Sequence, residues 1–250
     1  MRALRLVAVM CCIAACGGSS GGMNTGDDDG PMADARVFLD APPTVPPQLM
    51  ITGTTTERGL SGTTAVAGVT VAVYTNGNDS SSIASAMSDA QGNFSLMVPT
   101  NGMPIDGYLL ATKASYVDLY MYPTGAFIAN SESNDINMIT PSNKDFLSNL
   151  AGGNQMAGKG LIGLAVVDGQ GNPVQGATVS STPAAGSYHY TGSSGLPDSG
   201  ATSTSADGVA FMFNVPNGQI TVSASKSGMT FKSHVVTARA DKMTTTGISE

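Results

Sequence analysis

The stretch "SDAQGNFSLMVPTNG" (Ser88–Gly102) decides the fold, because the chain repeats it as "SADGVAFMFNVPNG" (Ser205–Gly218). Each copy reads as a polar turn with a glycine, a run of alternating apolar residues, and a Val-Pro exit followed by Asn-Gly. A period of two is typical of a β-strand with one buried face. The repetition therefore indicates a duplicated fold rather than a site.

Within the first copy, the alternation predicts that Phe94, Leu96 and Val98 point inward. The turn glycines, Gly92 and Gly208, are expected to relieve tight backbone geometry. The second copy carries one extra residue, and Ala210 stands where the first has Phe94. The strand register of the second copy near Ala210 is therefore open by one residue.

The sequences that flank the two copies also resemble each other. "AVAGVTV" (65–71) parallels "PVQGATV" (173–179), and "ATKASY" (111–116) parallels "ASKSGM" (224–229). Val69, Val71 and Val73 share a face in the first unit. We expect two β units at residues 49–140 and 160–250, the second with a loop insertion rich in Gly, Ser and Pro at 182–203.

One helix is predicted between the units, within a linker at 141–159. In "TPSNKDFLSNLAGG" (140–153), Thr140 can cap the helix, Pro141 suits its first position, and Gly152 and Gly153 end it. Its apolar stripe is expected to pack between or against the two units.

The repeated motifs resemble the carboxypeptidase regulatory-like domain, a transthyretin-like β-sandwich. The resemblance implies an all-β chain of two tandem antiparallel sandwiches joined by a short helix, and it implies a fold rather than a reaction. The zinc peptidase domain that accompanies this sandwich in metallocarboxypeptidases has a His-x-x-Glu pair. The two histidines here, His189 and His234, have no acidic residue three positions on. The peptidase activity of metallocarboxypeptidases is therefore not expected of this chain, and we predict no catalytic residues, metal or cofactor.

The charge balance argues against nucleic-acid partners. The chain has a net charge of −7 and no basic cluster with interleaved aromatic residues, so its acidic surface would repel phosphates.

The N-terminus predicts a lipid anchor. Arg2 and Arg5 precede an apolar run of signal-peptide length, which ends in Ile13-Ala14-Ala15-Cys16. This ending resembles the lipobox of bacterial lipoproteins and implies cleavage after residues 1–15 and lipidation of Cys16. Residues 16–48 then form a Gly/Ser/Asp/Pro tether. Gly17 after the cysteine, with the overall layout, resembles outer-membrane lipoproteins of the myxobacterial type and implies the cell envelope, with the membrane as a partner through the lipid.

Two tyrosine-rich segments are the candidate ligand sites. In "YVDLYMY", strand alternation places Val117, Leu119 and Met121 in the core. The opposite face then carries Tyr116, Asp118, Tyr120 and Tyr122, a surface on which sugar rings can stack. The favoured alternative is that these tyrosines pack under the helix or against the second unit.

The second segment is "SYHYTG" in the insertion, which puts Tyr188, His189 and Tyr190 on a loop. A surface loop without ligand is the favoured alternative. The absence of Trp also weakens a sugar site.

The sequence predicts a non-enzymatic envelope lipoprotein that serves as a membrane-tethered binding or structural module, with envelope proteins or glycans as partners. The alternatives are a carbohydrate-binding module that uses these tyrosines and, less favoured, a hydrolase.

Overall fold

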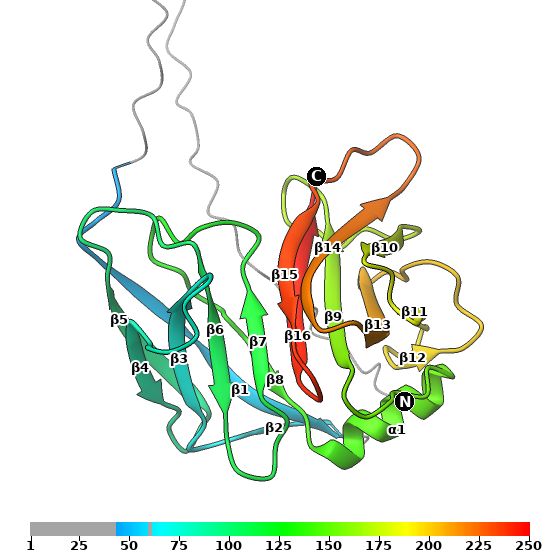
Figure 1. Ribbon diagram of the computed structural model, residues 1–250, viewed down its shortest axis with the longest axis horizontal. Helices are drawn as coiled ribbons and strands as arrows, with labels where there is room; N and C mark the ends of the chain where they lie inside the picture. Colours follow the sequence, from blue (N-terminus) through cyan, green and yellow to red (C-terminus); the bar gives the residue numbers. More distant parts are fainter. Residues whose placement is uncertain (1–43, 60–61) are drawn as a thin grey trace, which may run out of the picture.

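The computed structural model describes residues 44–59 and 62–250, so Cys16, the lipobox and the tether up to Pro43 lie outside the described residues. The described chain is nearly all β, as predicted (Figure 1). Its first part contains β1 (Gln48–Gly59), β2 (Gly62–Ala65), β3 (Thr70–Thr75), β4 (Ala84–Met87), β5 (Asn93–Pro99), β6 (Gly107–Thr112), β7 (Leu119–Tyr122), β8 (Ile136–Met138) and the helix α1 (Pro141–Ala151). Its second part contains β9 (Gly160–Val167), β10 (Thr178–Thr182), β11 (Ser187–Thr191), β12 (Pro197–Asp198), β13 (Val209–Val215), β14 (Gly218–Ser225), β15 (His234–Ala238) and β16 (Met243–Ser249).

The first unit is a sandwich of two sheets. A small sheet, in which β1 pairs with β2, β5 and β8, faces the strands β7, β6, β3 and β4. The predicted inward residues of β5 lie in the core between them, with Phe94 4%, Leu96 1% and Val98 0% exposed. The alternation of β5 thus packs against the valines of β3, which are fully buried.

The second unit has the same plan. A small sheet of β10, β14 and β15 faces the strands β12, β11, β13, β9 and β16. Side chains from both layers fill its core, among them Ile162, Leu164 and Val222.

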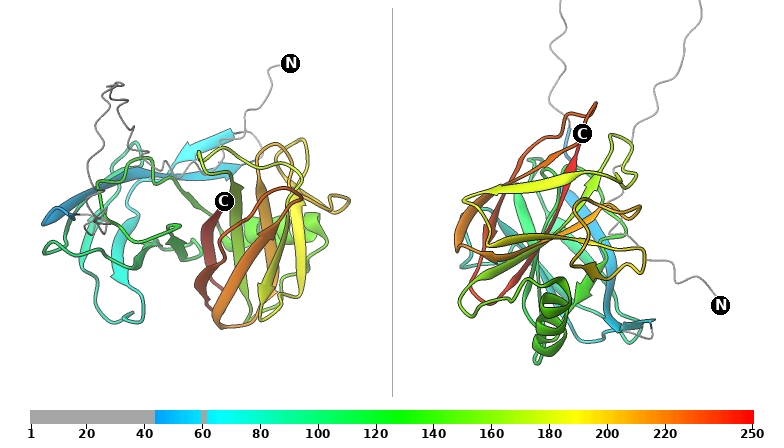
Figure 2. Two further views of the ribbon diagram at one scale, coloured as in Figure 1. Left: turned by 90° about the horizontal axis from the view of Figure 1, so that it is seen from above. Right: turned by 90° about the vertical axis from the view of Figure 1, so that its right-hand side faces the viewer.

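The C-terminal strand β16 joins the two units into one sheet. It runs parallel to β7 of the first unit and parallel to β9 of the second, with Met243 in register with Leu119 and Leu161. The result is a nine-stranded sheet in the order β12-β11-β13-β9-β16-β7-β6-β3-β4, and β16 lies between the units in Figures 1 and 2. Since this strand is paired on both sides, the units share a backbone ladder in addition to the helical connection.

The two small sheets cover opposite faces of this long sheet. On β7, Leu119 and Met121 belong to the first core, whereas Tyr120 and Tyr122 point to the side of the second core. Each small sheet therefore covers the long sheet only within its own unit. At the junction of the units, one face of the long sheet is left uncovered on either side, and each of these two places is called a step below. The candidate sites described below lie at these two steps.

Helix α1 lies between the units in the chain, where the capping residues expected from the sequence stand. The Thr140 side chain accepts a hydrogen bond from the Asn143 amide (3.2 Å), and Gly152 ends the helix in the left-handed conformation at φ 77°. The helix packs against the edge of the second unit through Ala151, beside Leu161 and Phe213.

The repeated phrase forms a turn and a core strand in both units. Gly92 (φ 81°) and Gly208 (φ 68°) adopt left-handed conformations and pass close to the backbone of β1 and β9. The extra residue of the second copy is a β-bulge, since the register of β13 against β9 shifts between Met212 and Val215. The open register is thereby settled, because Ala210 points into the core at 0% exposure, as Phe94 does.

Two features differ from the predicted antiparallel sandwiches with a loop insertion. The pairs of β16 with β7 and β9, and of β8 with β1, are parallel. The segment 182–203 is also not simply a loop, because β11 and β12 lie within it and extend the long sheet. The Gly, Ser and Pro content of this segment is typical of a loop, and the alternation in "SYHYT" is too short to indicate a strand against that background.

Candidate functional site

The face of the first unit predicted to bind ligands is part of the junction between the units. Tyr120 and Tyr122 of β7 lie beside Tyr108 of β6, with ring centres 5.6 and 5.0 Å from that of Tyr108. Tyr74 of β3 stacks on Tyr108 from the other side at 5.5 Å. A tyrosine ladder thus exists, but it runs across the strands rather than along β7.

Arg239, just after β15 of the second unit, covers this ladder. Its guanidinium carbon lies 4.0 Å from the centre of the Tyr120 ring and 5.1 Å from that of Tyr108. It donates hydrogen bonds to the Tyr122 hydroxyl (3.2 Å) and to the Asp79 carboxylate (2.7 Å). Cation–π contacts of this kind are worth about 0.5–2 kcal/mol each, depending on desolvation.

The electrostatics of this cluster favour the charged pair. Tyr108 donates a hydrogen bond to Asp79 (2.6 Å), and this bond, with the one from Arg239, lowers the pKa of Asp79. Burial and the same hydrogen bond raise the pKa of Tyr108. Although burial disfavours its charge, the hydrogen bonds of Arg239 to Asp79 and Tyr122 raise the pKa of Arg239. The cluster therefore links the two units through polar contacts.

Tyr116 does not lie on the same face as Tyr120 and Tyr122, which corrects that part of the predicted alignment. The chain turns at Ser115 (φ 71°), β7 begins only at Leu119, and the Tyr116 ring packs on the first core. The Tyr116 hydroxyl donates to Glu57 (2.8 Å). Asp118 instead accepts a hydrogen bond from Lys242 (2.6 Å), and this bond raises the pKa of Lys242.

The second candidate segment lies on the strand β11, not on a loop. The Tyr190 hydroxyl accepts a hydrogen bond from the Val179 amide (3.1 Å), and the Tyr188 hydroxyl accepts one from the Ser181 amide (3.2 Å), so both rings hold β10. His189 points to the opposite side, where its ring lies edge-on to Phe213 at 5.4 Å.

The chain offers no exposed tyrosine to a sugar ring. All seven tyrosines lie in the described part, where Tyr108, Tyr122 and Tyr190 are buried and the others are half-buried. The rings that the carbohydrate-binding hypothesis needs are thus packed at least partly against protein.

Neither histidine stands in a catalytic arrangement. His234 Nδ1 lies 2.7 Å from the Thr246 hydroxyl, but Thr246 is only 5% exposed, so a substrate cannot reach that oxygen. Burial lowers the pKa of both His189 and His234, which keeps the rings neutral near pH 7. Among the described residues, no three His, Cys, Asp or Glu side chains gather as metal ligands.

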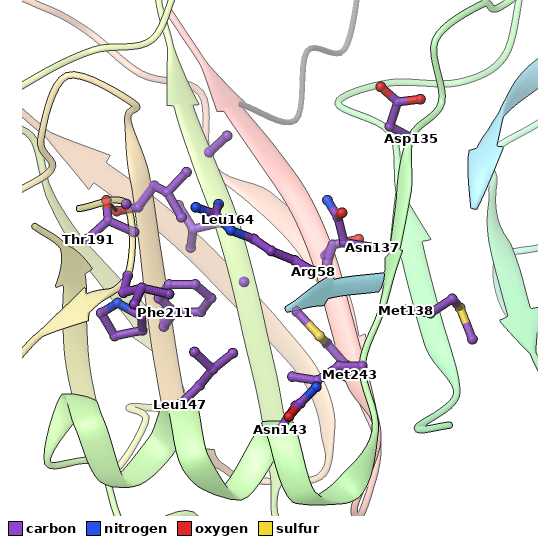
Figure 3. A pocket seen from close by; sticks show the side chains of 18 of the residues that line it. Arg58, Asp135, Asn137, Met138, Asn143, Leu147, Leu164, Thr191, Phe211 and Met243 are labelled. Carbon is purple, nitrogen blue, oxygen red and sulfur yellow. Dashed lines mark hydrogen bonds between the residues drawn. The ribbon is translucent and has the colours of Figure 1, made fainter. Parts of the chain in front are cut away.

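The other step at the junction is an apolar cavity that no sequence motif indicated. It has a volume of about 190 Å³ and lies between α1, the ends of β1 and β8, and the strands β9, β13 and β16 (Figure 3). Leu147, Phe211 and Met243 contribute its apolar surface. Gly163 leaves room for it, because a Cβ there would lie 3.3 Å from Met243 Cε and 3.6 Å from Phe211 Cε1.

Polar side chains line this cavity from several elements, among them Asp135 before β8, Asn143 of α1 and Thr191 of β11. Arg58 and Asn137 line it from β1 and β8, and Thr245 lines it from β16. Thr245 Oγ1 is buried and has no hydrogen-bond partner in the described part of the chain. Within residues 44–59 and 62–250, Arg58 forms neither an ion pair nor a side-chain hydrogen bond. The cavity therefore combines an apolar hollow with hydrogen-bonding groups that the protein leaves unused.

Within residues 44–59 and 62–250, no helix is long and apolar enough to span a membrane.

Comparisons with known proteins give a fold likeness of low precision. No family model matches the chain, and no curated protein matches it. Among solved structures, the Bacillus anthracis TIE protein is 12% identical over 80% of this chain and 34% of its own, with a TM-score of 0.24. A cohesin–X-dockerin complex from Acetivibrio cellulolyticus is 20% identical over 44% and 65%, with a TM-score of 0.28. The minor pilin GBS52 of Streptococcus agalactiae is 14% identical over 81% and 96%, with a TM-score of 0.26. Since all three TM-scores are low, these likenesses add nothing to the assignment of the fold. The strands and cores of the described residues show an all-β protein of two units.

Proposed function

We propose that this chain is a non-enzymatic cell-envelope lipoprotein, in which the two β units act as one rigid binding and structural module. The observation that carries the proposal is β16, which is paired with both units and makes them a single sheet. A rigid body at the end of a tether suits a spacer or a docking module better than a pair of independently moving domains. The lipobox-like residues before Cys16 support the membrane as its place of attachment.

The anchor is tested with a Cys16→Ser variant of the full chain. The unchanged protein should take up labelled fatty acid and fractionate with membranes, because several acyl chains on one cysteine hold a protein firmly at a bilayer. The variant should lose the label and leave the membrane fraction. A variant that stays in the membrane fraction, unlabelled, would contradict the anchor.

Rigidity is tested by spin labels, one in each unit. The three cysteines of the chain are Cys11, Cys12 and Cys16, so the predicted mature chain with Cys16→Ser can carry new cysteines without interference. Labels at Met87→Cys and Lys232→Cys, both exposed positions, should give a narrow distance distribution. A broad distribution, as for two domains on a flexible linker, would refute the rigid module and leave the anchor untouched.

A further inference from the structure

The apolar cavity at the junction is large enough to hold a small organic group. Its volume of about 190 Å³ exceeds that of engineered cavities of about 150 Å³ that stay dry and bind benzene. Its walls come from both units and from α1, so it exists only because the units are fixed relative to each other.

One end of the cavity carries polar side chains. Figure 3 shows the Arg58 side chain reaching from β1 across the hollow towards Leu164, while the carboxylate of Asp135, which also lines the cavity, points away from Arg58. Asp135 instead accepts a hydrogen bond from the Thr54 hydroxyl (2.6 Å). Asn137 accepts a bond from the Thr56 hydroxyl (2.9 Å) through its side-chain oxygen, which leaves its N–H groups for another acceptor.

The arrangement of donors indicates the charge of the ligand. A half-buried guanidinium is favoured by a carboxylate partner, which it binds through paired, charge-assisted hydrogen bonds. No described carboxylate fills that role for Arg58. The Asn137 amide and the unpartnered Thr245 hydroxyl add two more groups that can donate to an anion.

We propose that this cavity binds a small monocarboxylate whose apolar body is about the size of one phenyl ring. The carboxylate lies against Arg58, with Asn137 as second donor, and the body fills the hollow between Leu147, Phe211 and Met243. This goes beyond the module function, since it assigns a soluble ligand that requires no membrane anchor.

The test uses three probes with the same body and different heads: 3-phenylpropionate, 3-phenylpropanol and 3-phenylpropylammonium. They are titrated into the mature chain with Cys16→Ser, which keeps both cores and every described strand. The ¹³C-methyl resonance of Met243 is the reporter, because a ring in the cavity shifts it, and the exposed Met97 and Met103 are internal references. The carboxylate is expected to bind at least tenfold more tightly than the alcohol, and the ammonium more weakly than either.

Four variants separate the contribution of the head group from that of the apolar body. Arg58→Gln should weaken 3-phenylpropionate about tenfold or more and leave 3-phenylpropanol unchanged, whereas Arg58→Lys should retain part of the preference. Lys232→Gln removes the same charge at an exposed position after β14 and should change nothing. Gly163→Ala narrows the hollow beside Met243 and Phe211 and should weaken the carboxylate and the alcohol by a similar factor.

The proposal is overturned if the Met243 methyl does not shift at millimolar 3-phenylpropionate. It is also overturned if the three probes bind equally, or if Arg58→Gln and Lys232→Gln behave alike. Native methionine-methyl spectra of each variant ensure that a loss of binding is not a loss of fold.

Discussion

The guanidinium carbon of Arg239, in the second unit, lies 4.0 Å from the centre of the Tyr120 ring in the first. This contact links the two units on the face of the long sheet that the first small sheet leaves uncovered. It belongs to a cluster in which Asp79 and Tyr122 also bind the same guanidinium. The most conspicuous aromatic cluster of the chain therefore serves cohesion between the units.

Replacing Arg239 should weaken the whole protein. Arg239→Leu removes the stacking on Tyr120 and the hydrogen bonds to Tyr122 and Asp79, and we expect the free energy of unfolding to fall by about 2 kcal/mol. Urea denaturation followed by circular dichroism measures the change. Lys232→Leu, at an exposed position, is the control and should stay within about 0.5 kcal/mol of the unchanged protein. Equal effects of the two variants would show that the cluster contributes no stability.

The shared strand predicts that the two units unfold together. Leu96→Ala creates a cavity in the first core only and should cost about 2–5 kcal/mol. Because β16 is paired with both units, this variant should unfold both units at one urea concentration, lower than that of the unchanged protein. The methyl resonances of Met138 in the first core and Met212 in the second should therefore lose their native positions together. Separate midpoints for Met138 and Met212 would mean that the units are energetically independent.

The turn glycines should not tolerate a side chain. At Gly208 a Cβ would lie 2.6 Å from the Val166 carbonyl oxygen, and at Gly92 it would lie 2.4 Å from that of Thr55. Gly77 has a similar left-handed backbone (φ 81°) but open space around it. We expect Gly77→Ala to cost about 1–2 kcal/mol from the backbone alone, and Gly92→Ala or Gly208→Ala about 1–3 kcal/mol more. Thermal unfolding of the three variants decides the point, and equal costs would argue against the close approach.

Acidification should destabilise the protein through its histidines. Burial lowers the pKa of His234, with Asp106 partly opposing the shift, and burial also lowers the pKa of His189. As the pH falls below the unfolded value of about 6.5, the unfolded chain takes up protons first, so stability is complete above that pH and declines towards the folded pKa. Urea midpoints between pH 7.5 and 5 should fall for the unchanged chain.

The matched variant is His189→Gln with His234→Gln, which keeps polar side chains without the titration. Its urea midpoints should change less over the same range. If the pH dependence persists undiminished, the histidines are not its source.

Much of the fold follows from the sequence because strand periodicity is local. The alternation of Phe94, Leu96 and Val98 is enough to predict a buried face, and Thr140 with Gly152 is enough to place the helix. The bulge of β13 is visible as the extra residue before Val215. These features depend on neighbours within a few positions, which is why they can be read without knowing the partners.

The joining of the units depends on pairing between distant segments, which periodicity does not encode. "MTTTGIS" predicts a strand, but nothing in it says that Met243 lies between Leu119 and Leu161. For the same reason the alternation of β7 separates Tyr120 from Leu119 but does not say that Arg239 covers the tyrosine. The cavity at Arg58 cannot be predicted from the sequence, because its walls come from several separate segments and share no motif.

The position of β16 also constrains the order in which the chain can assemble. During synthesis β7 is made with the rest of the first unit, yet one of its edges has no native partner until the last residues of the second unit emerge. The open edge of a nearly finished sheet is prone to pair with other chains. A truncation before Met243 should therefore produce aggregates of an exposed first unit, not a smaller soluble protein.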